Sequence, residues 1–303
     1  MNENTPLVTV VVPVFNAERY IYKALKSVCE QTYTNLEIIV LDDGSSDGTR
    51  RIIESIDDVR IKLISRENRG LIATLNEGVT ASKGTYIARM DADDICLPDR
   101  FARQVEFFQN NKGFGVLFTG IEYIDASDDI IRKKIAHETR TIKSVELIFG
   151  CPLCHPTAMF NMSELTKSDL RYDLEFDKTE DFELWTRLIL KTEIALLGDV
   201  LFQYRIHSDS ITSNNNVEQR KTALRAIERN LSEIKSNKVI RSLGVIYNNH
   251  QGGDSFLRTL KAIFIVYINL NKINVGFSNH KFLSKSYYLL RNKLKRNSNI
   301  SLR

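Results

Sequence analysis

The sequence predicts an α/β protein in which helices cover both faces of a mostly parallel sheet, followed by a C-terminal helical region. Three observations lead to this class. Short apolar runs alternate with amphipathic stretches over the first half of the chain, acidic clusters follow two of those runs, and the C-terminal part has an excess of Lys and Arg. Repeated strand and helix signals are typical of a parallel sheet buried on both faces. The chain has 303 residues, 43% hydrophobic and 26% charged, which is a globular composition.

Two apolar runs near the N-terminus predict buried strands. Val8–Val14 is nearly continuous valine, and residues 36–41 form the second run. Between the two runs, Ile21, Leu25 and Val28 recur at the spacing of one helical face. The order strand, helix, strand is therefore expected at the start of the chain.

The same alternation continues after the second strand. A helix is expected near residues 50–56, a third strand at 59–64 and a fourth strand at 86–90. Gly84 is interpreted as the C-cap of the helix before the fourth strand. The helices on either side of that strand are marked by apolar residues at helical spacing: Leu71, Leu75, Val79, Phe101, Val105 and Phe108.

The charge distribution predicts two domains. Residues 1–219 contain 25 Lys and Arg against 35 Asp and Glu, a net charge of minus 10, whereas residues 220–303 contain 17 against 3, a net charge of plus 14. A polar break at residues 213–216 separates the two parts. We therefore expect a sheet domain at 1–215 and a basic helical region at 216–303.

The sequence also predicts a cytoplasmic protein. Residues 1–6 contain no basic region before an apolar core, so no secretory signal is expected. The longest apolar stretch, residues 262–268, is far shorter than the ~18 residues of a membrane span. All four cysteines are then expected to be reduced. Cys151 and Cys154 with His155 also match the c-type haem attachment pattern, and we interpret them as part of a loop.

Two acidic clusters fall directly after predicted strands. Asp42-Asp43-Gly44-Ser45 follows the second strand, and Asp91-Ala92-Asp93-Asp94 follows the fourth. Ligands of such sheets bind outside the carboxyl ends of the strands. Carboxylates gathered there repel one another unless a cation or hydrogen-bond donors lie between them. An Asp-x-Asp on a loop can supply hard oxygen ligands to Mg²⁺ or Mn²⁺ and leave positions for phosphate oxygens.

These clusters are part of a series of motifs that resembles glycosyltransferase family 2. The motifs lie within residues 7–212 and occur in the order seen in the family: Pro13-Val-Phe-Asn16, Asp42-Asp43-Gly44-Ser45, Asn68-Arg69-Gly70, Asp91-Ala92-Asp93-Asp94, and Glu180-Asp181 with Leu184-Trp185. Members of this family are inverting, nucleotide-sugar-dependent enzymes with the GT-A fold. The resemblance therefore implies that residues 1–215 form a GT-A catalytic domain.

The resemblance also implies roles for individual residues. Residues expected to bind the nucleotide-sugar are Pro13, Phe15, Asn16, Glu18, Asp42, Asp43, Arg69, Asp91 and Ala92. Of these, either Asp42 or Asp43 would hydrogen-bond the base or ribose. Asp93 is expected to ligate the metal directly, although Asp94 could substitute, and His207 could complete the coordination as a neutral imidazole.

Asp181 matches the catalytic base of the family. Displacement with inversion requires a carboxylate that deprotonates the acceptor hydroxyl on the face opposite the leaving diphosphate. Glu180 and Asp181 can also be explained as acidic residues that interact favourably with a helix N-terminus. Both interpretations can hold together.

The resemblance implies transfer of a hexose or N-acetylhexosamine from a UDP-sugar, with Mn²⁺ or Mg²⁺ as cofactor. The acceptor would be a saccharide or an undecaprenyl-diphosphate-linked sugar, in cell-surface polysaccharide biosynthesis of the O-antigen or capsule type. One alternative is a non-catalytic nucleotide-sugar-binding scaffold. Another is an α/β-hydrolase, because Gly44-Ser45-Ser46-Asp47-Gly48 fits the Gly-x-Ser-x-Gly motif with Ser46 as nucleophile.

The basic C-terminal region predicts a membrane contact. Apolar and aromatic residues alternate with Lys and Arg between residues 260 and 296, a composition that suits helices lying on an anionic bilayer. We therefore expect peripheral attachment to the inner face of the plasma membrane and no nucleic-acid partner. The competing interpretation is that this region packs on the catalytic domain.

Overall fold

A computed structural model of the chain describes residues 5–134, 138–148, 151, 153–207, 217–231, 237–248, 256–273 and 286–287. The chain divides into two compact units whose segments alternate along the sequence. The sheet unit consists of Met1–Ile142, Leu153–Leu174 and Lys191–Ser213, and the helical unit consists of Lys143–Pro152, Glu175–Leu190 and Asn214–Arg303. The predicted domain boundary after residue 215 stays a prediction.

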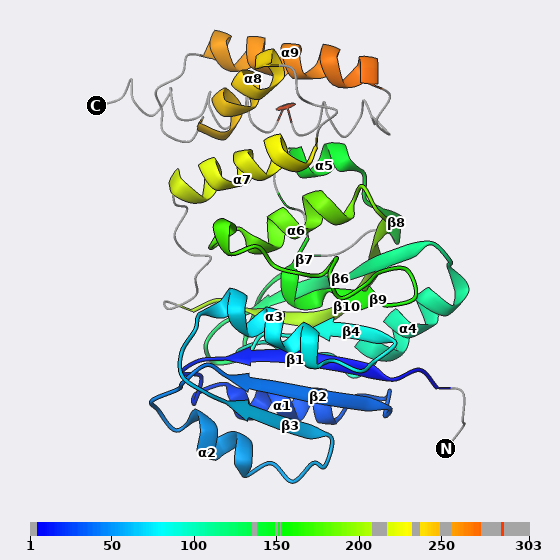
Figure 1. Cartoon of the computed structure of the whole chain (residues 1–303), viewed down its shortest axis with the longest axis vertical. Helices are drawn as coiled ribbons and strands as arrows, with labels where there is room; N and C mark the ends of the chain where they lie inside the picture. The colour runs from blue at the N-terminus through cyan, green and yellow to red at the C-terminus, as the bar shows by residue number, and fades with distance from the viewer. Residues whose placement is uncertain are drawn as a thin grey trace. The chain divides into compact units, whose positions relative to one another are not determined.

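The sheet unit is built on one sheet with the strand order β3-β2-β1-β4-β9-β6-β10-β5, in which β7 pairs with β6 and β8 with β10 (Figure 1). The strands are β1 (Val8–Val14), β2 (Leu36–Asp42), β3 (Ile61–Ser65), β4 (Tyr86–Arg89), β5 (Ile95–Cys96), β6 (Phe114–Ile124), β7 (Ile130–Lys134), β8 (Arg140–Thr141), β9 (Met159–Asn161) and β10 (Glu193–Arg205). The four strands β1 to β4 are parallel. The short strand β9 runs antiparallel to both β4 and β6, so the complete sheet is mixed.

Helices cover both faces of this sheet, as predicted. They are α1 (Ile21–Cys29), α2 (Thr49–Glu54), α3 (Leu71–Ala81) and α4 (Arg100–Asn110). Alternate residues of β1, beginning with Val8, share a core with the buried side chains of α1 and α4. Val11 points to the other face, where it meets α3 at Gly78. A Cβ atom on Gly78 would lie only 2.4 Å from Val11 Cγ1, so this glycine allows α3 to pack closely on the sheet.

Two element boundaries differ from the prediction. The third strand begins at Ile61, two residues later than expected, because Val59 is 96% exposed in the turn that precedes it. The helix before β4 ends at Ala81, and the Ser82 hydroxyl donates to the Gly78 carbonyl at its end. Gly84 is therefore not its C-cap. A Cβ at Gly84 would lie 2.6 Å from Thr9 N, so this glycine permits a close backbone approach instead.

In its described residues the helical unit has five α-helices, and successive members pack together. They are α5 (Ser144–Ile148), α6 (Glu180–Leu188), α7 (Val217–Asn230), α8 (Asn237–Asn248) and α9 (Phe256–Ile273). The C-terminal region is thus helical where it is described, as the sequence predicted. Among the described residues, no helix is both long enough and apolar enough to cross a membrane.

Candidate active site

The loops that follow β1 and β2 hold each other in place. Asn16 has a positive φ of 48°, its N–H donates to Ser45 Oγ at 2.9 Å, and its side-chain oxygen accepts the Ser46 N–H at 2.8 Å. Glu18 Oε2 accepts the Gly48 N–H at 2.6 Å. Pro13 lies within β1, and Phe15 projects from the loop with half of its surface exposed. Of the predicted binding residues in this loop, Asn16 and Glu18 are therefore held by hydrogen bonds, and Phe15 exposes its aromatic ring.

Asp42 and Asp43 are buried at the carboxyl end of β2 and have different partners. Asp42 accepts the Ser45 N–H at 2.9 Å and the Ser65 hydroxyl at 2.8 Å. Asp43 accepts the N–H groups of Arg69 and Gly70, at 2.8 and 2.9 Å, at the start of α3. Each carboxylate therefore has a fixed position, and an ionised carboxylate can accept further hydrogen bonds from a ligand.

Arg66 is a basic residue at this site that the sequence did not single out. Its guanidinium forms an ion pair with Asp43, and its Nε donates to Glu77 Oε2 at 2.6 Å. The Arg69 side chain, which was predicted to bind nucleotide, is exposed and has no recorded partner within the described part of the chain. Arg66 thus neutralises Asp43, and Arg69 is available to an anionic ligand.

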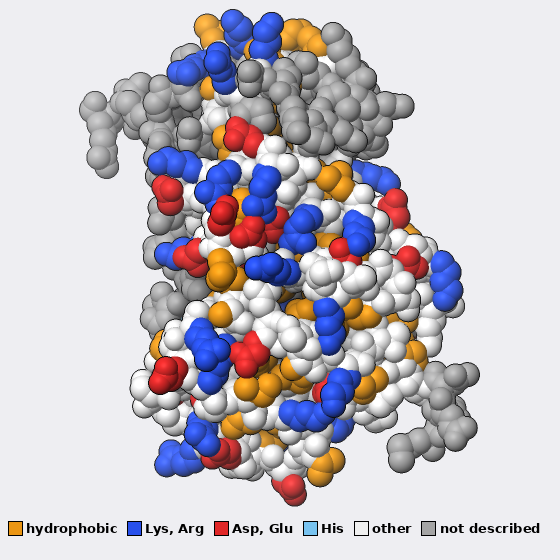
Figure 2. Space-filling model, in the orientation of Figure 1, with side chains coloured by type: hydrophobic (Ala, Val, Ile, Leu, Met, Phe, Trp, Pro, Cys, Tyr) orange, Lys and Arg blue, Asp and Glu red, His pale blue; other side chains and the backbone are white. Residues whose placement is uncertain are grey.

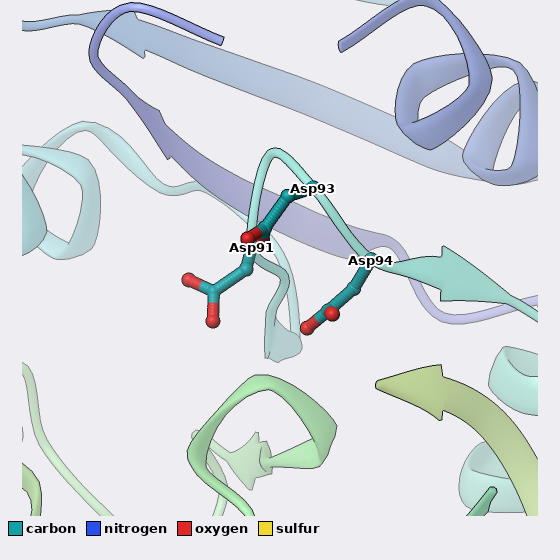
Figure 3. Close-up of side chains that lie close together, drawn as sticks. All are labelled: Asp91, Asp93 and Asp94. Carbon is teal, nitrogen blue, oxygen red and sulfur yellow. The ribbon is translucent and has the colours of Figure 1, made fainter. Parts of the chain in front are cut away.

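The acidic cluster after β4 forms one tight turn (Figure 3). Asp91, Asp93 and Asp94 each offer an oxygen atom, and these atoms lie within 4.8 Å of one another. Asp91 and Asp93 are partly exposed, whereas Asp94 and Ala92 are buried. The strand pairing brings this turn to the same edge of the sheet as the loops after β1 and β2, because β4 and β2 are the two parallel neighbours of β1.

The two predicted metal ligands lie next to each other. His207 follows the end of β10, and its Nε2 is 2.9 Å from Asp93 Oδ2 although the residues are 114 positions apart. The imidazole ring also lies beside the ring of Tyr20, with 5.2 Å between centroids. The structure therefore brings together Asp93 and His207, both predicted as metal ligands, and places Asp91, which was predicted to bind the nucleotide-sugar, beside Asp93.

Arg205 holds the acidic turn in position through hydrogen bonds to Asp93 and Asp94. Its N–H donates to Asp94 Oδ1 at 2.7 Å and its Nε to the Asp93 carbonyl at 2.6 Å. Its Nη1 donates to the Asp125 carbonyl at 2.7 Å and pairs with Asp128 at 2.6 Å. Its guanidinium is buried and engaged by these protein acceptors, so it does not face a phosphate.

Charges beneath the turn are only partly compensated. Burial raises the pKa of the Asp94 carboxyl well above its usual range, and the charges of Asp93 and Asp91 raise it further. Its Oδ2 has no hydrogen-bond partner among the described residues. The buried Arg89 at the end of β4 pairs with Asp91, while its Nε and Nη1 likewise have no partner there. The turn therefore carries more negative charge than Arg89 offsets.

These residues fit a divalent cation. Asp91 and Asp93 provide carboxylate oxygens, which hard cations such as Mg²⁺ and Mn²⁺ prefer, and His207 provides an imidazole nitrogen that Mn²⁺ also accepts. The buried and unpartnered oxygen of Asp94 adds to the local demand for positive charge. His155, in contrast, does not fit the haem pattern, because it is buried and its Nε2 lies 2.7 Å from the Tyr172 hydroxyl.

Asp181 lies in the first turn of α6, which belongs to the helical unit. Its side chain is partly exposed and accepts the Phe182 N–H at 2.6 Å. Glu180 and Glu183 share this first turn, so the acidic start of the helix has the favourable dipole interaction that we considered as its structural explanation. The role of Asp181 as a base stays a prediction.

The fold matches solved structures of glycosyltransferases. The structure of S. aureus TarS 1-349 in complex with UDP-GlcNAc superposes with a TM-score of 0.67 at 16% identity, covering 96% of this chain and 92% of that one. The mannosyltransferase PcManGT from Pyrobaculum calidifontis, in complex with GDP-Man and Mn²⁺, gives 0.54 at 17% identity, covering 99% and 82%. The fold is therefore the GT-A fold of glycosyltransferases.

Sequence comparison defines the family. A model of Glycosyl transferase family 2 matches residues 9–168. An uncharacterized glycosyltransferase of Haemophilus influenzae is 31% identical over 90% of this chain and 89% of its own. The putative glycosyltransferase EpsE of Bacillus subtilis is 34% identical over 68% and 75%. The chain belongs to glycosyltransferase family 2, and its activity is that of a glycosyltransferase.

Proposed function

We propose that the protein is an inverting, metal-dependent glycosyltransferase that moves a hexose or N-acetylhexosamine from a UDP-sugar. The acceptor is a saccharide or an undecaprenyl-diphosphate-linked sugar of a cell-surface polysaccharide. The observation that carries the proposal is the contact of His207 with Asp93 in the acidic turn. TarS, which shares the fold, was solved with UDP-GlcNAc, and this supports a UDP-sugar as donor.

The sheet unit provides the donor site in this proposal. The loop from Pro13 to Glu18 and the carboxylates of Asp42 and Asp43 bind the nucleoside, and the exposed Arg69 approaches the diphosphate. Asp91, Asp93 and His207 would hold Mn²⁺ or Mg²⁺. A divalent cation bound there neutralises charge on the departing diphosphate. The buried guanidinium of Arg205 fixes the turn from which these ligands extend.

The helical unit provides the base. Asp181 takes the proton of the acceptor hydroxyl as that oxygen attacks the anomeric carbon from the side opposite the diphosphate. The configuration of the sugar is inverted as a result. Membership of family 2 favours this transfer chemistry over the hydrolase alternative. The Ser46 hydroxyl, the nucleophile of that alternative, donates to the Asn16 side-chain oxygen at 3.4 Å.

A donor screen tests this function. The protein is incubated with Mn²⁺, a lipid-linked saccharide acceptor and each of UDP-Glc, UDP-Gal, UDP-GlcNAc, UDP-GalNAc and GDP-Man, and release of the nucleoside diphosphate is measured. We expect release from one of the UDP-sugars. Release from GDP-Man alone would contradict the UDP assignment, and no release from any donor would favour the scaffold alternative.

The variant Asp181→Asn tests the base in the same assay. Removing a general base lowers kcat by about 10²- to 10⁴-fold. The KM for the donor should stay near that of the wild type, because the variant changes no proposed donor contact. An unchanged kcat would show that another group accepts the proton.

A further inference from the structure

The outer side of α9 presents a row of exposed apolar side chains. Four of them recur three or four residues apart and therefore lie along one side of the helix: Leu257 is 74% exposed, Leu260 41%, Phe264 60% and Ile268 36%. We call these four residues the outer row. Exposed apolar residues are common singly, but a continuous row of this kind marks an interaction surface.

The inner side of the same helix is already used for packing. Thr259, Ala262, Ile263 and Val266 are buried, and α9 packs on α8, whose Val239, Leu243 and Ile246 are also buried. The α8–α9 pair therefore has its own core, and the outer row does not contribute to that core. Ligand binding at the outer row requires no unfolding of the pair.

The charge of the α8–α9 pair has one sign only. The two helices contain five Lys and Arg residues and no Asp or Glu. Lys238, Arg241, Arg258 and Lys261 are exposed, and Figure 2 shows basic side chains beside hydrophobic ones over these helices. The preceding helix α7, in contrast, contains both Glu218 and Glu228. Of these three helices, only α8 and α9 therefore contain no acidic residue.

This combination selects among possible occupants of the surface. Water solvates the cations but leaves the outer row exposed, and a nucleic acid would pair with the cations without burying aliphatic side chains. A bilayer with anionic headgroups satisfies both: its phosphates attract Lys and Arg, and its acyl boundary accepts Leu, Ile and Phe. Lys261, which lies between Leu260 and Phe264 in sequence, can extend its charged end toward the headgroups.

We propose that the α8–α9 pair docks on an anionic bilayer surface, with the outer row entering the boundary between headgroups and acyl chains. The helix axis of α9 lies along the surface, because its apolar residues form one side and its buried residues pack on α8. This attachment goes beyond the proposed reaction and does not depend on it. It would retain the enzyme at a surface where a lipid-linked acceptor is found.

Vesicle sedimentation of the full chain tests the attachment. Vesicles of phosphatidylcholine are compared with vesicles containing equal amounts of phosphatidylcholine and phosphatidylglycerol. We expect binding to the anionic vesicles only. The double variant Leu260→Gln/Phe264→Gln should partition onto the anionic vesicles at least about tenfold more weakly than the wild type, because two apolar side chains no longer enter the bilayer.

A matched control keeps the test specific. Val59→Gln removes an apolar residue that is 96% exposed in the sheet unit, and it should bind vesicles like the wild type. The double variant should unfold thermally at the wild-type temperature, since both of its positions are exposed. Lys238→Gln/Arg241→Gln should also weaken binding, and its remaining binding should depend less on salt.

Three results would overturn the proposal. The first is equal binding of the double variant and the wild type to anionic vesicles. The second is a lack of binding to anionic vesicles by the wild type. The third is self-association without lipid that the double variant abolishes, because the outer row would then be an interface between two copies of the chain.

Discussion

Arg205 is the residue that most directly determines the position of the acidic turn. Its side chain reaches the Asp93 carbonyl on one side and the Asp125 carbonyl and Asp128 carboxylate on the other. Its guanidinium also lies over the Tyr20 ring, 4.7 Å from the centroid. Only a planar group with several donors can serve these acceptors at once. We therefore regard Arg205 as a positioning residue for Asp93.

Arg205→Lys tests this positioning role. Lysine keeps the charge but has a single ammonium group, so the Asp93 carbonyl loses its fixed donor. We expect the Mn²⁺ concentration for half-maximal activity to rise by about tenfold, the scale of effects from residues that orient metal ligands. Arg103→Lys is the control, because Arg103 is exposed and forms an ion pair with Asp199. This variant should leave the Mn²⁺ concentration for half-maximal activity unchanged. If Arg205→Lys needs no more Mn²⁺ than the wild type, Arg205 is not a positioning residue for Asp93.

The sequence identified individual site residues where they belong to a motif. The contact of His207 with Asp93 joins two residues that were both proposed as metal ligands, and only the resemblance to the family connected them. Arg66 and Arg89 were missed because each acts through a partner supplied by folding. A lone arginine at the end of the buried strand β4, two residues before an acidic cluster, is a signal that could have identified Arg89.

At the level of elements, helix α3 depends on a small residue at its contact with the sheet. Gly78 faces Val11 and Leu41, and an added Cβ would lie 2.4 and 3.1 Å from their side chains. Gly244 in α8 is different, because the nearest atom to an added Cβ is 3.8 Å away. The same substitution should therefore have opposite effects at the two helical positions.

Gly78→Ala should lower the free energy of unfolding by about 1–3 kcal/mol, because an added methyl group overpacks the contact with the sheet. Gly244→Ala should raise it by up to about 1 kcal/mol, since alanine favours the helical backbone and meets no obstruction. Urea unfolding at neutral pH measures both. A stabilised Gly78→Ala variant would show that α3 does not pack on β1 as described.

Helix α6 is held to α7 by the buried carboxylate of Glu183. This group accepts hydrogen bonds from Arg187 at 3.1 Å, Arg229 at 2.6 Å and Asn230 at 2.9 Å. Burial alone would raise the pKa of Glu183, but the hydrogen bonds from Arg187, Asn230 and Arg229 outweigh it and lower the pKa. Since α6 also carries Asp181, Glu183 stabilises the element that bears the proposed base.

Glu183→Gln should destabilise the protein by about 1–3 kcal/mol at neutral pH, because two partly exposed arginines lose their charged acceptor. The carboxyl pKa is lower in the folded chain, so its contribution is complete above the unfolded pKa of about 4.3 and decreases as the pH falls below it. The difference from the wild type should shrink accordingly in urea unfolding at acidic pH. Glu218→Gln, on the surface of α7, is the control. An equal effect of both variants would contradict the role of Glu183.

The elements of the first half of the chain largely followed from the sequence, but the long strands β6 and β10 and the short strands β5 and β9 did not. Continuous apolar runs identified β1 and β2, since strands buried on both faces need apolar residues throughout. The strands β5 and β9 have only two and three residues, too few for a periodic pattern. Pairing of β9 with β4 and β6 is set by tertiary structure, which explains why the mostly parallel sheet also contains antiparallel pairs beyond β4.

At the level of the whole molecule, the residues named in the proposed function are distributed over both compact units. The nucleotide and cation residues belong to the sheet unit, and Asp181 belongs to the helical unit. The helical unit also includes the α8–α9 pair that we propose docks on a bilayer.

The central claim is that the acidic turn binds a divalent cation together with a nucleoside diphosphate. Electron paramagnetic resonance of Mn²⁺ titrated with the full chain and UDP measures this directly. We predict that the wild type binds Mn²⁺ in the presence of UDP and that Asp93→Asn weakens this binding by more than about tenfold. The control variant Asp199→Asn changes a partly exposed acidic residue of β10 and should bind Mn²⁺ as the wild type does. Equal Mn²⁺ binding by Asp93→Asn and the wild type would contradict the account.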